Sequence, residues 1–219
     1  MQQQFHRVIA IDGPAASGKS SVARELSRQL GFVYVNSGAI YRAITWHILQ
    51  KEIDPEDNKC IMQALQSAPI TGALQDNELR VVIDNVDPAD HLRDDRVNEK
   101  VARISQFPEV RQIVSEKLHR DAHSHNLIVE GRDIGSVVFP DTPYKFYVDA
   151  SPQVRLQRRA AQGGRDEIAQ RDRADSSRLV SPLIIAKDAH VIDTSHLAID
   201  EVVGQIIGRL KQLGLPIGS

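Results

Sequence analysis

Residues 7–20 read Arg-Val-Ile-Ala-Ile-Asp-Gly-Pro-Ala-Ala-Ser-Gly-Lys-Ser, an apolar run that leads directly into a glycine-containing loop. Positions 13–20 fill every fixed place of the pattern Gly-x-x-x-x-Gly-Lys-Ser/Thr. A helical pattern covers residues 20–30, and Gly31 ends it. In such a strand–loop–helix unit, the backbone N–H groups of the loop and the positive end of the helix face a phosphate chain. The stretch therefore predicts a nucleoside triphosphate site, and its context disfavours a plain turn before an ordinary helix.

The residues of this loop differ in what each contributes. Gly13 and Gly18 allow the backbone to curl. Lys19 can reach the β- and γ-phosphate oxygens, and the Ser20 hydroxyl can ligate Mg²⁺. Glu130 ends a later apolar run, at a place where a second carboxylate often holds Mg²⁺ or its water. The loop residues expected to bind the triphosphate are Gly13, Pro14, Ala15, Ala16, Ser17, Gly18, Lys19, Ser20 and Ser21.

The overall composition excludes several classes of protein. The 219 residues are 41% hydrophobic and 26% charged, and a net charge of −2 gives no field that would draw the chain to nucleic acid or an anionic membrane. No apolar run approaches the roughly 20 residues of a membrane span, and residues 1–6 lack the features of a signal peptide. The single cysteine, Cys60, fits a reducing compartment. We therefore expect a cytoplasmic monomer that binds neither nucleic acid nor membranes.

Arginine is unevenly distributed along the chain. Of the 27 basic residues, 19 are arginine, and seven of these lie between residues 155 and 178. The planar fork of arginine grips phosphate oxygens in pairs, which lysine cannot do. Acidic residues are interspersed, so a solvated helix face is the alternative. The triphosphate site favours the functional interpretation, because the charge of the phosphates must be neutralised.

Apolar, β-branched runs alternate with helical patterns over most of the chain. The runs cover 7–11, 32–35, 126–129, 144–149 and 189–193, and the helical patterns cover 20–30, 39–51, roughly 97–122, 152–162 and 199–213. Runs that are apolar throughout are typical of parallel strands buried on both faces. The pattern predicts an α/β fold with a doubly wound, five-stranded parallel sheet. Ligands of such sheets bind at the carboxyl ends of the strands.

Two segments interrupt this alternation. Residues 70–74, 79–84 and 86–92 predict a small antiparallel meander inserted between the second and third core strands. The charged segment 161–181 contains Gly163-Gly164 and suits a flap over the phosphates, with an ordinary exposed loop as the alternative.

Three groups of residues outside the loop carry a resemblance to a known family. They are Asn-Ser-Gly-Ala-Ile-Tyr-Arg at 36–42, Phe-Pro-Glu-Val-Arg at 107–111 and Glu-Gly-Arg-Asp-Ile-Gly-Ser-Val-Val-Phe-Pro at 130–140. Arg158-Arg159, the stretch 171–178 and Ser181-Pro182-Leu183 extend the match. Taken singly only the loop is specific, but the ordered set resembles bacterial cytidylate kinases, a family of P-loop nucleoside monophosphate kinases, over nearly the whole chain.

Ser37 follows the second predicted strand and can cap the helix that carries Arg42. The resemblance implies one P-loop kinase domain. Its core would cover about 1–62, 104–154 and 179–219, with an inserted NMP-binding subdomain at about 63–103 and a short lid at about 155–178. The implied activity is transfer of the γ-phosphate of ATP to CMP or dCMP with Mg²⁺. The acceptor would contact Ser37, Arg42, Arg111, Arg132, Asp133, Arg171, Asp175 and Arg178. Catalytic roles would fall to Lys19, Arg132, Arg171 and Arg178, and Arg155, Arg158 and Arg159 would approach ATP from the lid.

Within this resemblance, Arg111 and Asp133 are placed beside the base, and their chemistry suits cytosine. A carboxylate accepts from the exocyclic amine, and an arginine donates to the ring acceptors. Uracil exchanges donor and acceptor at two of these positions, so it would leave a buried polar group of the protein without a hydrogen-bond partner. The chain departs from the family at Ala102, commonly serine, at Asn36, commonly aspartate, and in its shorter flap.

Two other functions remain as alternatives. One is a small P-loop kinase with UMP, a deoxynucleoside or a non-nucleotide acid as acceptor. The other is a nucleotide-dependent switch, which would need a guanine-reading motif such as Asn-Lys-x-Asp that the chain lacks.

Overall fold

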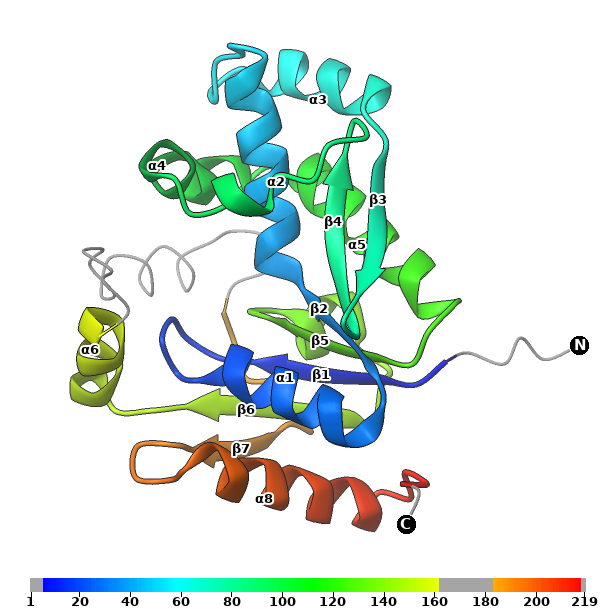
Figure 1. The fold of residues 1–219 in the computed structure, drawn as a ribbon, viewed down its shortest axis with the longest axis vertical. Helices are drawn as coiled ribbons and strands as arrows, with labels where there is room; N and C mark the ends of the chain where they lie inside the picture. The colour runs from blue at the N-terminus through cyan, green and yellow to red at the C-terminus, as the bar shows by residue number, and fades with distance from the viewer. Residues whose placement is uncertain (1–5, 162–182, 218–219) are drawn as a thin grey trace, which may run out of the picture.

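The computed structural model describes residues 6–161 and 183–217. Within this part of the chain, seven strands form one sheet in the order β3-β4-β2-β5-β1-β6-β7 (Figure 1). The strands are β1 Val8–Asp12, β2 Val33–Asn36, β3 Ile70–Gln75, β4 Glu78–Ile83, β5 Leu127–Gly131, β6 Tyr144–Asp149 and β7 His190–Asp193. The five strands β2, β5, β1, β6 and β7 pair in parallel. The predicted α/β fold with a five-stranded parallel core is confirmed.

Helices cover both faces of this sheet. They are α1 Lys19–Leu30, α2 Ser37–Gln50, α3 Asn58–Ser67, α4 Asp95–Ile104, α5 Pro108–Ala122, α6 Pro152–Ala161 and α8 Ile199–Gln212, with a 3₁₀ turn η1 Ala89–His91 and a π-helical turn η2 Ile134–Val138. Alternate residues of β1 point to opposite faces. Ile9 and Ile11 join a buried cluster with α1 and α8, whereas Val8 and Ala10 join one with α2 and α5.

The β3–β4 hairpin extends the sheet at the β2 edge. Its strands pair antiparallel from Ile70↔Ile83 to Gln75↔Glu78, and β4 meets β2 only at Tyr34↔Glu78. Asp76 and Asn77 turn the chain with positive φ angles of 49° and 63°, as a two-residue hairpin loop with this twist requires.

The predicted third strand of the meander, residues 86–92, is wrong. Asp84 and Asn85 have positive φ angles of 50° and 63°, and they form a second tight turn that pairs Val86 with Ile83 alone. Proline at 88 then begins the 3₁₀ turn η1. The turn ends the hairpin after one bridge, so no third strand forms.

Two of the helical predictions also need correction. The helix expected over roughly 97–122 is two helices, α4 and α5, because Pro108 lacks an N–H and disfavours a helical Phe107. Helix α3 was not predicted, although Asp57 caps it by accepting a hydrogen bond from the Cys60 N–H at 3.0 Å. In Figure 1, α3, α4 and the hairpin lie above the parallel core.

Candidate functional site

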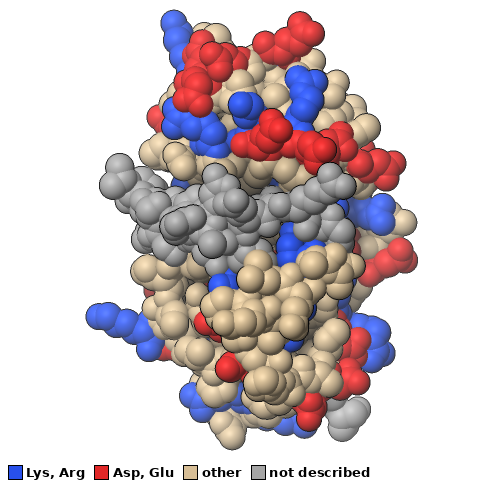
Figure 2. All heavy atoms as spheres, turned by 90° about the vertical axis from the view of Figure 1, so that its left-hand side faces the viewer, with Lys and Arg blue, Asp and Glu red and all other residues tan. Residues whose placement is uncertain are grey.

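A cleft of about 1700 Å³ lies at the carboxyl ends of the core strands. Elements of the core line one side of it, and β4 and α4 line the other. Figure 2 shows Lys and Arg side chains scattered over one face of the molecule, with a few visible near its middle. The cleft brings together these predicted site residues: Ala15, Ala16, Ser17, Gly18, Lys19, Ser20, Ser21, Ser37, Arg42, Arg111, Glu130, Arg132, Asp133 and Arg159.

The backbone of the 13–20 loop is curled as its sequence predicts. Gly13 has φ 152°, and a Cβ there would lie 2.1 Å from the Val148 carbonyl oxygen. Gly18 has φ 94° and caps the N-terminus of α1. Ala16 has φ 58°, a conformation that is uncommon outside glycine. A loop held this way keeps its N–H groups turned toward a common centre.

Lys19 and Ser20 are the reactive side chains of this loop. Lys19 is buried, and its Nζ donates to the Pro14 carbonyl at 2.9 Å across the loop. The Ser20 hydroxyl donates to Glu130 Oε2 at 2.8 Å. A hydroxyl and a carboxylate at this distance are hard oxygen donors of the kind that Mg²⁺ prefers. The residues present therefore fit the predicted metal position.

Besides Ser20, two other residues donate hydrogen bonds to Glu130. It is 3% exposed at the end of β5, and its Oε1 accepts a hydrogen bond from the Tyr34 hydroxyl. The Ser37 hydroxyl donates to the Glu130 carbonyl at 2.8 Å. The expected cap of α2 by Ser37 is therefore wrong. Asn36 caps the helix instead, since its side chain accepts from the Ala39 N–H at 3.1 Å.

On the side of the cleft where the acceptor is expected, here called the acceptor side, Arg111 and Asp133 form a buried ion pair. Each side chain is 7% exposed, and Arg111 Nη2 donates to Asp133 Oδ2. Arg111 Nη1 donates to the Ser105 carbonyl at 3.1 Å, while Nε is buried without a partner among the described residues. The guanidinium also lies over the Tyr41 ring, 5.5 Å from its centroid. Arg111 and Asp133, the two residues predicted to contact a base, therefore lie together, and the Nε donor of Arg111 is without a partner among the described residues.

The two other described acceptor arginines reach the cleft from opposite directions. Arg42 Nη1 donates to the Leu92 carbonyl at 2.9 Å and to Asn98 Oδ1 at 2.7 Å, which ties α2 to α4. Arg132 follows β5 directly and donates to the Gly131 carbonyl at 3.3 Å. Both are half-buried, so their charges are partly desolvated at the cleft wall.

Asp12 connects the donor loop to the acceptor side. It directly precedes Gly13, and its carboxylate accepts from the Ile134 and Gly135 N–H groups, each at 2.8 Å. Burial raises the pKa of Asp12 to about 6, against the lowering effect of the two N–H groups. The sequence alone gave no sign of this contact, because residues 12 and 134 come together only in the sheet.

Comparison with known proteins decides the family of this chain. The family model described as cytidylate kinase matches residues 9–212. The chain belongs to the cytidylate kinase family. Relatives named cytidylate kinase include those of Caldanaerobacter subterraneus subsp. tengcongensis (39% identical, covering 93% of this chain and 94% of that protein) and Corynebacterium efficiens (40%, covering 91% and 92%). A shikimate kinase from Acinetobacter baumannii shares the fold, with a TM-score of 0.50, 17% identity and 98% and 97% coverage.

Some positions that the cytidylate kinase resemblance singled out lie elsewhere than the cleft. Arg155 is 9% exposed, and it donates to the Ala150 carbonyl at 3.2 Å and to Ala15 at 3.3 Å. Arg155 therefore supports the loop from behind. Arg158 also supports the loop, since it donates to the Ser17 carbonyl at 3.2 Å and to Thr194, but it lines the cleft as well. Gly13 and Pro14 do not line the cleft, and Arg171, Asp175 and Arg178 lie outside the described residues.

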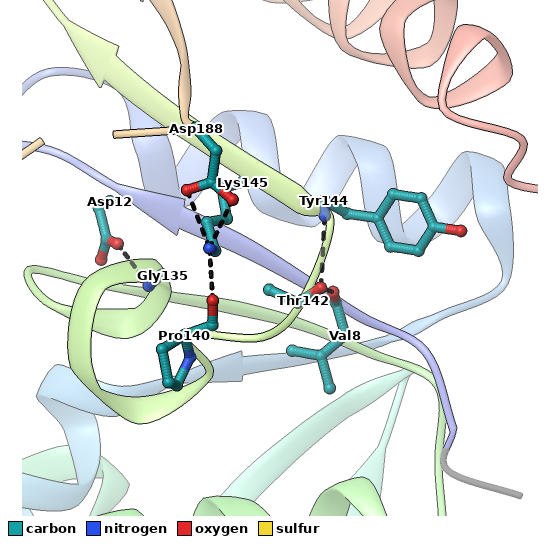
Figure 3. A network of polar contacts seen from close by, with 8 residues as sticks. All are labelled: Val8, Asp12, Gly135, Pro140, Thr142, Tyr144, Lys145 and Asp188. Atoms are coloured by element: carbon teal, nitrogen blue, oxygen red, sulfur yellow. Dashed lines mark hydrogen bonds and ion pairs between the residues drawn. The ribbon is translucent and has the colours of Figure 1, made fainter. Parts of the chain in front are cut away.

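This chain also has a buried lysine, Lys145, that was not predicted from the sequence (Figure 3). Lys145 on β6 donates to the Pro140 carbonyl at 2.5 Å and pairs with Asp188 at 2.7 Å. Its side chain packs beneath Gly135, where an added Cβ would lie 3.1 Å from Lys145 Cγ. The contact fixes the turn that follows Asp133. A lysine in an otherwise apolar run is the one sequence signal that marks it.

In residues 6–161 and 183–217, every helix is too short or too polar to cross a membrane.

Proposed function

We propose that this protein transfers the γ-phosphoryl group of ATP to CMP or dCMP and releases ADP with CDP or dCDP. The observation that carries the proposal is that the phosphate loop and the Arg111–Asp133 pair line one cleft. Membership of the cytidylate kinase family supports it independently. A loop for a triphosphate and a polar pair for a second ligand, open to the same space, suit direct transfer between two substrates.

On the donor side, the loop N–H groups would hold the β- and γ-phosphates. Lys19 would exchange its bond to Pro14 for phosphate oxygens, because an ammonium binds a charged phosphate more strongly than a neutral carbonyl. Ser20 and Glu130 would hold Mg²⁺ there, which when bound neutralises charge on the phosphates. Arg159, from the end of α6, lies on the same cleft and would add positive charge.

On the acceptor side, Asp133 would accept from the exocyclic amine of cytosine, and Arg111 would donate to the ring acceptors. The Nε of Arg111, buried without a hydrogen-bond partner among the described residues, supports this assignment, because an acceptor atom of a ligand would satisfy this donor. Ser37, Arg42, Arg132, Arg171 and Arg178 would hold the acceptor's phosphate, and Asp175 its sugar. Arginines around that phosphate would offset the charge of the group in transit.

The acceptor atom is an anionic phosphate oxygen, so the transfer needs no general base. The competing reaction is hydrolysis of ATP by water. The protein's task is therefore to align two phosphates, neutralise their charge and exclude water. We further propose that it works as a cytoplasmic monomer on free nucleotides, consistent with its single cysteine and a net charge of −2.

The test is a steady-state comparison of CMP, dCMP, UMP and AMP as acceptors with Mg²⁺ and ATP. We expect ADP to form rapidly only when CMP or dCMP is present. A clear preference for UMP or AMP would assign the protein to another small kinase. Nucleotide binding without acceptor-dependent ADP formation would favour a switch and sink the proposal.

A further inference from the structure

Each oxygen of the Glu130 carboxylate accepts a hydrogen bond from a different hydroxyl group. Oε2 accepts from Ser20 at 2.8 Å, and Oε1 accepts from Tyr34. Ser20 lies in the phosphate loop, whereas Tyr34 lies on β2, next to β5 in the sheet. The carboxylate is thus fixed at both ends, and only one end belongs to the phosphate loop.

The position of Tyr34 fixes the direction in which its hydroxyl donates a hydrogen bond. Its side chain is 1% exposed, and its backbone N–H donates to the Asn77 carbonyl at 2.8 Å. Its hydroxyl donates to Glu130 Oε1, and a buried carboxylate oxygen needs such a partner.

The face of the Tyr34 ring is covered by a charged side chain from α1. The Arg24 guanidinium lies 4.6 Å from the ring centroid. Arg24 in turn makes two hydrogen bonds to Glu78, of 3.1 and 3.2 Å, at the first residue of β4. Burial of the ring and this contact limit the positions that its hydroxyl can take.

We propose that Tyr34 is a positioning residue that holds Glu130 in the orientation in which it supports Mg²⁺ at Ser20. The inference deepens the proposed function and rests on it for the identity of the metal–nucleotide complex. Groups that orient a metal-supporting carboxylate typically contribute 10–100-fold to metal affinity. Without the phenol, one carboxylate oxygen loses its donor and the carboxylate is free to rotate away from Ser20.

The test compares Tyr34→Phe, which keeps the ring and removes the hydroxyl, with Tyr144→Phe as a matched control. Tyr144 is half-buried, and its hydroxyl makes no hydrogen bond within the described residues; its ring points away from the polar network of Figure 3. For each protein, ATP affinity is measured by calorimetry with excess Mg²⁺ and again with EDTA. The ratio of the two affinities is the readout, and it requires neither acceptor nor turnover.

We expect Tyr34→Phe to lower this ratio about tenfold, with ATP affinity in EDTA unchanged, and Tyr144→Phe to match the wild-type protein. In Glu130→Gln the ratio should also fall, and adding Tyr34→Phe to it should bring little further loss. Should Tyr34→Phe fail to fold, Tyr34→Leu removes the same hydroxyl and serves in its place.

Three outcomes would overturn the inference: a wild-type ratio in Tyr34→Phe, an equal loss of affinity with Mg²⁺ and with EDTA, or no Mg²⁺-dependent gain in the wild-type protein. Because the assay contains no acceptor, it stays separate from the proposed function. If CMP is not an acceptor, the proposed function is wrong, but the measured effect of Tyr34→Phe on Mg²⁺-dependent ATP binding still tests the role of Tyr34.

Discussion

The two sides of the cleft are built in opposite ways. The proposed donor side is the contiguous loop 13–20, whose groups expected to bind phosphate are mainly backbone N–H groups. The proposed acceptor side consists of side chains from distant parts of the chain, with Arg42 on α2, Arg111 on α5, and Arg132 and Asp133 after β5. A local motif can be recognised from its sequence, but a scattered set acquires its geometry only through the sheet.

The two sides also differ in what their charges do before a ligand arrives. In the loop expected to bind the donor, Lys19 carries the charge among the side chains expected to contact phosphate or Mg²⁺, and its Nζ donates to a neutral carbonyl, that of Pro14. On the acceptor side, Arg111 and Asp133 already neutralise each other, and Arg42 is bonded to Asn98. A buried pair that loses one partner leaves an uncompensated charge. Donor-side changes should therefore affect mainly turnover, whereas acceptor-side changes should affect selectivity and stability together.

The largest effect should come from the donor side. We expect Lys19→Ala to reduce turnover by about a hundredfold to a thousandfold, because charge on the transferring phosphoryl group loses its main cation. We expect Arg178→Ala, outside the described residues, to lose at least about a hundredfold. The measurement is CMP-dependent ADP formation, with thermal unfolding as the control for folding. Near-normal turnover in either purified variant would remove that residue from the catalytic set.

The second prediction concerns Asp12, where the two sides meet. Its pKa is raised from 3.8 to about 6, so between these values the folded protein binds a proton that the unfolded chain has released. Stability from this group is therefore greatest at low pH and is lost as the pH rises through about 6, by up to about 3 kcal/mol. Asp12→Asn cannot titrate, and its amide can accept only one of the two N–H groups. Its destabilisation relative to wild type should decrease as the pH rises from about 4 to 6, and should therefore be larger at pH 5 than at pH 7.5.

Denaturant unfolding of both proteins at several pH values measures this difference, because all other titrating groups cancel between them. A destabilisation that does not change with pH would mean that Asp12 is already ionised near pH 5. In that case the carboxylate would hold the two sides together across the whole range.

Asp133→Asn tests the acceptor side alone. An amide can still accept from cytosine but no longer balances the charge of Arg111, so we expect kcat/KM for CMP to fall about 10–100-fold. Loss of selectivity against UMP should accompany it. ATP affinity should change less than about twofold, since Asp133 pairs with Arg111 on α5 and not, within the described residues, with the 13–20 loop. An equal loss of ATP affinity would show that the two sides are not separable.

Ala102→Ser should have the smallest effect. Ala102 lines the cleft on α4, and a hydroxyl there would supply a further polar contact to the base. We expect the preference for CMP over UMP to rise by about three- to tenfold, measured as a ratio of kcat/KM values. Ala102→Val, which adds bulk without a hydroxyl, is the matched control. An equal rise in both variants would trace the change to shape.

Sequence reasoning succeeded where the determining signals were local. The strand, loop and α1 followed from residues 7–31, and the five parallel strands from continuous apolar runs, because such runs are buried on both faces. Errors came where two local readings competed. Ser37 and Asn36 are both good caps, and only the position of the Glu130 carbonyl draws the Ser37 hydroxyl away from the helix. The division of the chain into core, insert and lid stays a prediction.

The sequence by itself determined the triphosphate loop, the α/β class and, through ordered motifs, the family. Only the tertiary structure decided that Tyr34 donates to Glu130, that Asp12 binds the turn after Asp133, and that Arg155 supports the loop from behind. The physical reason is one of range. A backbone curl is specified by the glycines within it, whereas a buried hydrogen bond between residues 96 or 122 positions apart exists only once strands have paired.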